Sequence, residues 1–135
     1  VGFCGETEAE FQKTLDLFEK ARFDMAYISE YSPRKGTASE KMMKDDVPQK
    51  EKTRRWHALN DVLRRISFEK NREYDGRTVE VLVESSKNGL LSGKTDTFKP
   101  VLFHGAHGAK NLICQLAQVT ITKGREWVLE GVLKK

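Results

Sequence analysis

The feature that most constrains this chain is a change of hydrophobic period at Gly76. Before it, apolar residues recur at helical spacing, whereas residues 78–84 read Thr-Val-Glu-Val-Leu-Val-Glu and alternate along the chain. Helical spacing buries one stripe of a helix, and alternation buries one face of a strand. The sequence therefore predicts an α+β fold, in which a largely helical first part precedes an all-β second part.

The second part predicts five short strands and no helix. A turn of the hairpin type, Lys87-Asn88-Gly89, follows the first strand at 78–84. The other strands are expected at 90–95, 100–104, 112–122 and 126–133. So many short strands favour a closed or nearly closed antiparallel barrel of the OB kind, because closure removes exposed strand edges. Phe103 and Trp127 are expected in its core.

The first part predicts a strand, a helix and a second strand. Residues 1–4 look like the end of a buried strand, and Thr7 with Glu10 forms a capping box for a helix over 8–22. Residues 23–29 give the second strand. Two parallel strands are normally covered on both faces by further elements. Residues 1–40 are therefore expected to be the remnant of a larger α/β fold.

Two further helices are expected before Gly76. Thr37 and Glu40 form a second capping box, for a short helix to about residue 43, and a long helix of some 25 residues should follow Pro48. The long helix has a basic face and serves as a connector. The predicted division is residues 1–46, 47–75 and 76–135.

The charge of the chain is unevenly distributed. The net charge is +4, yet residues 1–40 carry three more acidic than basic side chains, residues 41–75 three more basic, and residues 76–135 four more basic. A basic half suggests a polyanion such as nucleic acid, although solvated lysines give the same count. No apolar run approaches the roughly 20 residues of a membrane span. We expect a cytoplasmic protein without a membrane role.

Several cations of the second part lie in predicted loops or at strand ends, where they could follow a phosphate backbone. The expected RNA-binding residues are Lys87, Lys94, Lys99, Lys110, Lys123 and Arg125, with Phe98 as the aromatic side chain for base stacking.

Catalytic and metal-binding residues are not expected in this chain. His57, His104 and His107 do not form a metal-binding set, and the two cysteines, Cys4 and Cys114, lie too far apart in sequence for a CxxC or CxxxCxxC motif. The chain alone should therefore be inactive and bind no cofactor by itself.

Three motifs in order resemble the radical-SAM methylthiotransferases over nearly the whole chain. They are Gly2-Phe3-x-Gly5-Glu6-Thr7, then Tyr31-Ser32-Pro33-Arg34-x-Gly36-Thr37, and then Asn71-Arg72-Glu73-Tyr74-x-Gly76-Arg77 continuing to Glu84. From Gly76 onward the chain resembles the family's TRAM domain, an OB-like barrel that holds tRNA. The resemblance implies that the first part is the end of a radical-SAM barrel.

The same resemblance implies the function of the parent protein. Such enzymes use S-adenosylmethionine and two 4Fe–4S clusters to add a methylthio group to carbon 2 of N(6)-isopentenyladenosine beside the anticodon. Gly5, Glu6 and Thr7 match a turn near the S-adenosylmethionine site, and Arg34 matches a loop that faces substrate or cofactor. By spacing alone, the glycine-rich turn also fits a plain tight turn, and Arg34 a solvated cation.

Two positions depart from the residues that are usual in the family's motifs. Cys4 and Lys35 stand where the family usually has proline, which leaves the local geometry of both loops open. The basic loop at Arg34 favours a tRNA substrate over a ribosomal protein.

Two alternative functions for the chain stay open. They are a stand-alone RNA-binding OB-like module and a fragment of a ribosomal-protein methylthiotransferase. Oligomeric state is not predicted.

Overall fold

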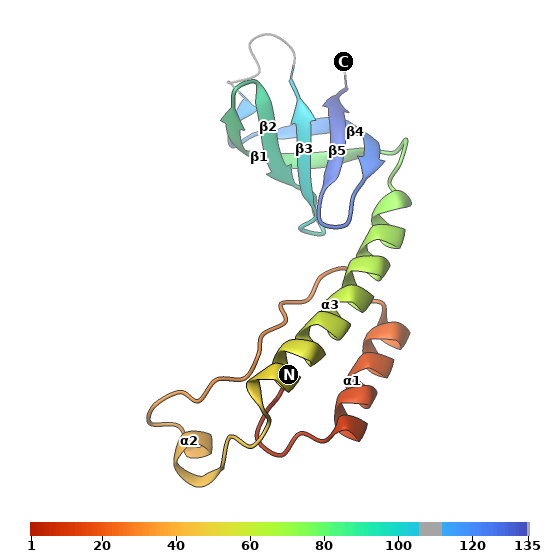
Figure 1. Cartoon of the computed structure of the whole chain (residues 1–135). Coiled ribbons are helices and arrows are strands. Elements are labelled where there is room, and N and C mark those ends of the chain that lie inside the picture. Colours follow the sequence, from red (N-terminus) through yellow and green to blue (C-terminus); the bar gives the residue numbers. More distant parts are fainter. Residues whose placement is uncertain (106–111, 135) are drawn as a thin grey trace. The chain divides into compact units, whose positions relative to one another are not determined.

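The computed structural model describes residues 1–105 and 112–134. It contains three helices and five strands within these residues, and the chain divides into two compact units, residues 1–66 and 67–135 (Figure 1). The division falls inside the long helix α3 (Gln49–Arg72), so its last residues, 67–72, belong to the second unit. The two units are described separately below.

The helices of the first unit begin where their caps were predicted. Helix α1 (Glu8–Ala21) has a complete capping box between Thr7 and Glu10, and it ends at Arg22, which adopts the left-handed conformation with φ of 49°. Helix α2 (Ala38–Met42) has half of the predicted box. The Thr37 hydroxyl accepts from the backbone of Glu40, whose carboxylate accepts from the amide of Gly36 at 3.3 Å.

The two strands predicted around α1 are absent, so the βαβ expectation is wrong for residues 1–4 and 23–29. Extended backbone from these regions does meet at one point. The amino group of Val1 donates to the carbonyl of Ser29 at 2.8 Å, and the amide of Tyr31 donates to the carbonyl of Val1 at 2.8 Å. One such contact does not make a ladder, because parallel strands are stable only when neighbouring elements cover both faces.

Helix α1 lies against α3 inside the first unit. Phe11 of α1 is fully buried, and the guanidinium groups of Arg54 and Arg55 lie 5.7 and 5.5 Å from its ring centroid. Gly2 approaches α3 closely: a Cβ atom there would lie 2.3 Å from Cγ of Lys52, and its φ is +76°. Only glycine satisfies both conditions.

The second unit is a closed five-stranded barrel with the order β1-β2-β3-β5-β4 (Figure 1). Its strands are β1 (Thr78–Lys87), β2 (Leu90–Lys94), β3 (Pro100–His104), β4 (Leu116–Gly124) and β5 (Leu129–Leu133). Four of the five pairings are antiparallel, but β3 and β5 are parallel, so the barrel is mixed. The purely antiparallel expectation is corrected here. Strand directions cannot alternate around a ring with an odd number of members, so one pair must be parallel.

The inward side chains of the five strands form one hydrophobic core. The core consists of Val81, Val83, Leu91, Val101, Phe103, Ala117, Val119, Ile121 and Leu129. The expectation for Phe103 is confirmed, whereas Trp127 is 37% exposed and lies in the β4–β5 loop, outside the layer that the strands enclose. Register shifts in β1 and β4 mark bulges, which bend strands and help a small barrel to close.

The last turn of α3 is bonded to the barrel within the second unit. The side-chain amide of Asn71 donates to the carbonyl of Arg125 at 2.7 Å, and its oxygen accepts from the ammonium of Lys99 at 2.9 Å. The Ser67 hydroxyl donates to the carbonyl of Glu126 at 2.6 Å. Asn71, Ser67 and Lys99 are all buried. The barrel unit therefore begins at about residue 67, within the helix.

Candidate nucleic-acid interface

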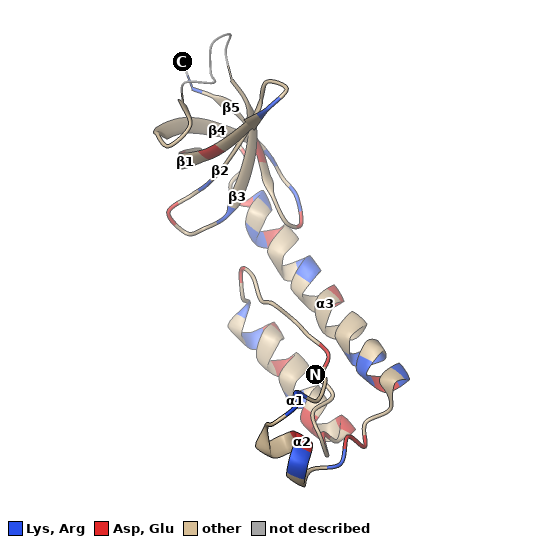
Figure 2. Ribbon diagram, turned by 90° about the vertical axis from the view of Figure 1, so that its left-hand side faces the viewer, with Lys and Arg blue, Asp and Glu red and all other residues tan. Residues whose placement is uncertain are grey.

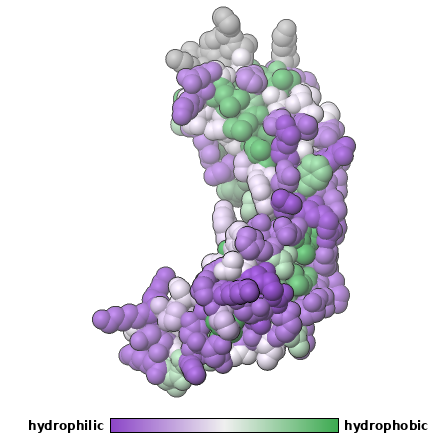
Figure 3. Space-filling view, viewed as in Figure 1, coloured by the Kyte–Doolittle hydropathy of each residue, from purple (hydrophilic) through white to green (hydrophobic). Residues whose placement is uncertain are grey.

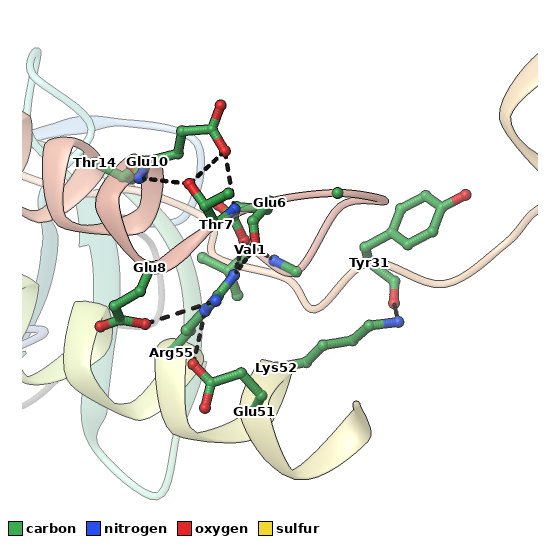
Figure 4. Close-up of polar contacts among 12 residues, drawn as sticks. Val1, Glu6, Thr7, Glu8, Glu10, Thr14, Tyr31, Glu51, Lys52 and Arg55 are labelled. Carbon is green, nitrogen blue, oxygen red and sulfur yellow. Dashed lines mark hydrogen bonds and ion pairs between the residues drawn. The ribbon is translucent and has the colours of Figure 1, made fainter. Parts of the chain in front are cut away.

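The glycine-rich turn ahead of α1 has its polar groups bonded inside the first unit (Figure 4). The amide of Gly5 donates to Asp46 at 2.7 Å, and the Glu6 carboxylate accepts from the amide of Gly2 and from Arg55 at 3.0 Å. The Thr7 hydroxyl takes part in the α1 cap. These partners in the chain hold the turn in place beside α3, and they engage one of the two oxygens of the Glu6 carboxylate.

A chain of ion pairs joins this turn to α3. Arg55 is only 6% exposed at its side chain, and it contacts Glu6 at 3.0 Å and Glu51 at 2.9 Å (Figure 4). Glu51 also accepts from Arg54 at 2.6 Å. The hydrogen bond with Arg54, followed by that with Arg55, lowers the pKa of the Glu51 carboxyl from 4.5 to about 2. This network stabilises the first unit and holds the turn on the helix.

The lowered pKa of Glu51 predicts acid sensitivity of the first unit. Because the folded pKa lies below the unfolded value, the carboxylate contributes stability above about pH 4.5 and loses it as the pH falls towards 2. Glu51→Gln should therefore lower the free energy of unfolding at neutral pH and flatten its decline between these values. Urea unfolding followed through Trp56 fluorescence at several pH values, with Trp127 replaced by Phe in every variant, measures this. Asp61→Asn, on the same helix, is the control, and an identical pH profile for Glu51→Gln and the parent would contradict the prediction.

Arg34 lies in the loop before α2 and is exposed. Its carbonyl accepts from the amide of Thr37 at 3.2 Å and from its hydroxyl at 2.8 Å. These bonds fix the backbone of the loop, while the guanidinium faces solvent. The position is compatible with a charged ligand and also with a solvated surface cation.

The exposed cations of the barrel differ in whether they form an ion pair. Lys94 is paired with Glu84 at 3.2 Å, and Arg125 with Glu130 at 2.9 Å. By contrast, Lys87 and Lys123 are exposed and form no ion pair with any residue that the structure describes. Figure 2 shows basic and acidic positions mixed over the loops and strand ends of the barrel in that view. A phosphate backbone would therefore meet unpaired cations at only a few positions.

Lys99 does not fit its expected role in RNA binding. It is 7% exposed, its ammonium donates to Asn71, and it lies 5.4 Å from the ring centroid of Tyr74. A buried ammonium held by an amide and an aromatic face supports the fold and is not available to phosphate. Lys110, also expected to bind RNA, lies outside the described residues.

Phe98 is the most exposed aromatic side chain described in the barrel, with 78% of its surface accessible. Its φ is +62°, a conformation that bulky residues rarely adopt. The turn around it is well bonded: its amide donates to the carbonyl of Thr95 at 3.0 Å, and the Lys99 amide donates to the Thr95 hydroxyl at 3.1 Å. The ring of Phe98 is therefore exposed to solvent on a turn that hydrogen bonds hold in place.

Apolar surface occurs at more than one place on the barrel. Figure 3 shows hydrophobic residues on the face that β2, β3 and β5 present, and Val132 of β5 is 45% exposed. A groove of about 230 Å³ lies on the outer surface of β1, β2 and β4. It is lined by Glu80, Leu82, Glu84, Lys94, Thr95, Asp96, Phe98 and Leu116.

Sequence reasoning missed the two leucines of this groove, although a signal was present. In β1 the inward positions are Val81 and Val83, so Leu82 must point outward, and it is 46% exposed. In β4 the inward positions are Ala117 and Val119, which places Leu116 outside with 62% exposed. An apolar residue at an outward strand position marks candidate contact surface.

Residues 1–105 and 112–134 contain no group of three or more His, Cys, Asp or Glu side chains arranged to hold a metal ion. Cys4 and Cys114 are both free thiols. The donor set of these residues does not fit a 4Fe–4S cluster, which takes four cysteines. No helix in the described residues is long and apolar enough to cross a membrane.

A small closed barrel of five strands, with an exposed aromatic ring and a basic excess, is typical of OB-like domains. Residues 72–134 match the family model of the TRAM domain, so the second unit is a TRAM domain.

Nearly the whole chain also matches larger proteins. It is 46% identical to the tRNA-2-methylthio-N(6)-dimethylallyladenosine synthase of Bacillus velezensis over 98% of this chain and 26% of that protein. The synthases of Bacillus licheniformis and Bacillus subtilis are 46% and 43% identical over 97% of this chain and 26% of theirs. The chain is homologous to the carboxy-terminal, TRAM-containing segment of these synthases, and it spans about a quarter of their length.

Proposed function

We propose that this chain acts as the carboxy-terminal part of a cytoplasmic tRNA methylthiotransferase and that its barrel holds the tRNA substrate. The observation that carries the proposal is the 46% identity to such a synthase across 98% of the chain, including the barrel. The substrate would be N(6)-isopentenyladenosine beside the anticodon, modified at carbon 2. The other parts of the parent enzyme would supply both 4Fe–4S clusters and the catalytic residues.

Within this proposal the first unit forms part of the wall beside S-adenosylmethionine. The resemblance of the motifs supports this role for Gly5, Glu6, Thr7 and Arg34. The turn groups are already bonded within the chain, so the turn would contribute shape to the wall. Arg34, with its exposed guanidinium, would supply the charge.

For the barrel we propose that Lys87 and Lys123 contact phosphate, because both are exposed without an ion pair among the described residues. Lys94 and Arg125 would have to exchange a carboxylate for a phosphate, which makes their contribution smaller. Lys110 remains a candidate of the same kind. Phe98 would stack on a base.

Salt dependence of RNA binding tests this assignment. The intact chain should bind an anticodon stem-loop RNA with an affinity that falls steeply as salt rises from 50 to 200 mM, since each phosphate contact releases bound counterions. Lys87→Ala combined with Lys123→Ala should weaken binding and reduce the slope of log K against log salt by about 1 to 2. Filter binding or fluorescence anisotropy measures both quantities.

The matched control removes the same charge from the other unit. Lys13→Ala combined with Lys20→Ala on α1 should leave the slope unchanged. Affinity of the parent chain that does not depend on salt would contradict phosphate contact by the barrel. An equal loss in both double variants would instead indicate a general effect of net charge.

A further inference from the structure

The groove on the outer surface of β1, β2 and β4 combines an apolar floor with an acidic rim. Leu82 lies at its centre, with Leu116 as its register partner on β4 and Lys94 as its partner on β2. The two leucines and Phe98 are 46%, 62% and 78% exposed. So much exposed apolar surface on adjacent strands of a small domain indicates a contact site.

The charges of the rim disfavour a phosphate group inside the groove, where Lys94 would first have to leave its partner Glu84. Three carboxylates line it, those of Glu80, Glu84 and Asp96, against one ammonium, that of Lys94. Since Lys94 is paired with Glu84 at 3.2 Å, the groove presents a net negative potential. Phosphate would be repelled there, whereas an uncharged group with hydrogen-bond donors would be accepted.

An unpaired RNA base has the properties that this groove selects. It is neutral and flat, its faces stack on aromatic rings, and its edge carries N–H groups that carboxylates accept. Phe98 presents such a ring at the edge of the groove, and Leu82 and Leu116 provide the apolar contact below it. The backbone of the RNA would then lie outside the groove, where its phosphates remain free to contact exposed lysines of the barrel.

We propose that this groove binds one unpaired base of the RNA, with Phe98 as the stacking platform and the carboxylates of Glu80 and Asp96 as acceptors from its edge. This inference rests on the proposed function of the barrel. It assigns base contact and phosphate contact to different surfaces of one domain.

The acidic rim implies a preference among bases. Guanine, adenine and cytosine each carry an exocyclic amino group that donates to a carboxylate, whereas uracil presents carbonyl oxygens in its place. The Glu80 carboxylate accepts from Gln118 at 3.2 Å, which leaves its other oxygen for a second donor. Uracil should therefore bind most weakly in this groove.

The test uses the intact chain and nine-residue oligoribonucleotides, uridine throughout except for the central base. Phe98→Asn removes the ring but keeps a residue that tolerates positive φ, so the turn is preserved. We expect this variant to bind the oligonucleotide with a central guanine between about 5- and 100-fold more weakly, with an unchanged salt slope. Phe98→Trp should retain binding. Tyr27→Ala, which removes a ring that is 97% exposed in the other unit, should have no effect.

Each outcome bears on one of the two proposals. Salt-dependent binding that is the same for the parent chain and for Phe98→Asn overturns the groove inference and leaves the proposed function standing. Failure of the parent to bind any RNA overturns the proposed function. Equal or tighter binding of the all-uridine oligonucleotide overturns the role of the carboxylates. If Phe98→Asn weakens binding of an alternating arginine–leucine peptide but not of RNA, the groove is a protein site and the inference is wrong.

Discussion

Asn71→Ala is expected to lower the free energy of unfolding of the second unit by about 3 kcal/mol. The Asn71 amide donates to the carbonyl of Arg125 at 2.7 Å, and its oxygen accepts from the buried ammonium of Lys99 at 2.9 Å. Alanine would remove both hydrogen bonds. The ammonium of Lys99, a residue that is only 7% exposed, would then lose this acceptor. Urea unfolding followed through Trp127 fluorescence, with Trp56 replaced by Phe in every variant, measures the loss.

Glu73→Ala is the matched control, because Glu73 lies two residues further on and is exposed. It should change the free energy of unfolding by less than about 0.5 kcal/mol. A similarly small change for Asn71→Ala would show that the helix end and the barrel are energetically independent. The same contacts imply that a truncated barrel should start at residue 67, since a start at residue 76 removes Asn71.

Gly93→Ala is expected to cost at least about 3 kcal/mol in the same unit, because the close approach of β1 and β2 leaves no room for a side chain. A Cβ atom at this position would lie 2.2 Å from the backbone carbonyl oxygen of Leu82 and 2.7 Å from a methyl group of Val81. Backbone cannot move aside without breaking the β1–β2 ladder. Thermal unfolding by circular dichroism measures the cost.

Ser92→Ala is the control for this substitution. Ser92 is the preceding residue of β2, already carries a Cβ atom and loses only a hydroxyl contact with Ser85 at 2.7 Å. It should be close to neutral. A Gly93→Ala variant that unfolds at the same temperature as Ser92→Ala would contradict the packing of these strands.

The parts of the fold that could be predicted are those that depend on residues close together in the sequence. The capping box at Thr7 and the change of period at Gly76 depend on residues within a few positions of each other, so the bounds of α1 and the presence of five strands could be predicted from the sequence. A parallel pair was not predicted, although closing five strands requires one; the structure places it between β3 and β5. The strands at 1–4 and 23–29 were predicted wrongly, because strand formation needs neighbours that these residues lack.

The candidate site was less predictable, because its properties depend on distances across the barrel. The lysines at positions 94, 99 and 123 look alike in the sequence. The structure pairs Lys94 with Glu84, buries Lys99 against Asn71 and leaves Lys123 exposed. Charge count alone could not separate these roles, since each partner lies far away along the chain or in another strand.

The sequence by itself determined the helix caps, the number of strands and the homology to the TRAM-containing segment of the synthases, because these reside in short motifs and local periodicity. Only the tertiary structure decided which cations are available and that Leu82, Leu116 and Phe98 share one groove. The physical reason is barrel closure, which brings β4 beside the β1–β2 hairpin on one surface and sets the distances that govern ion pairing and burial.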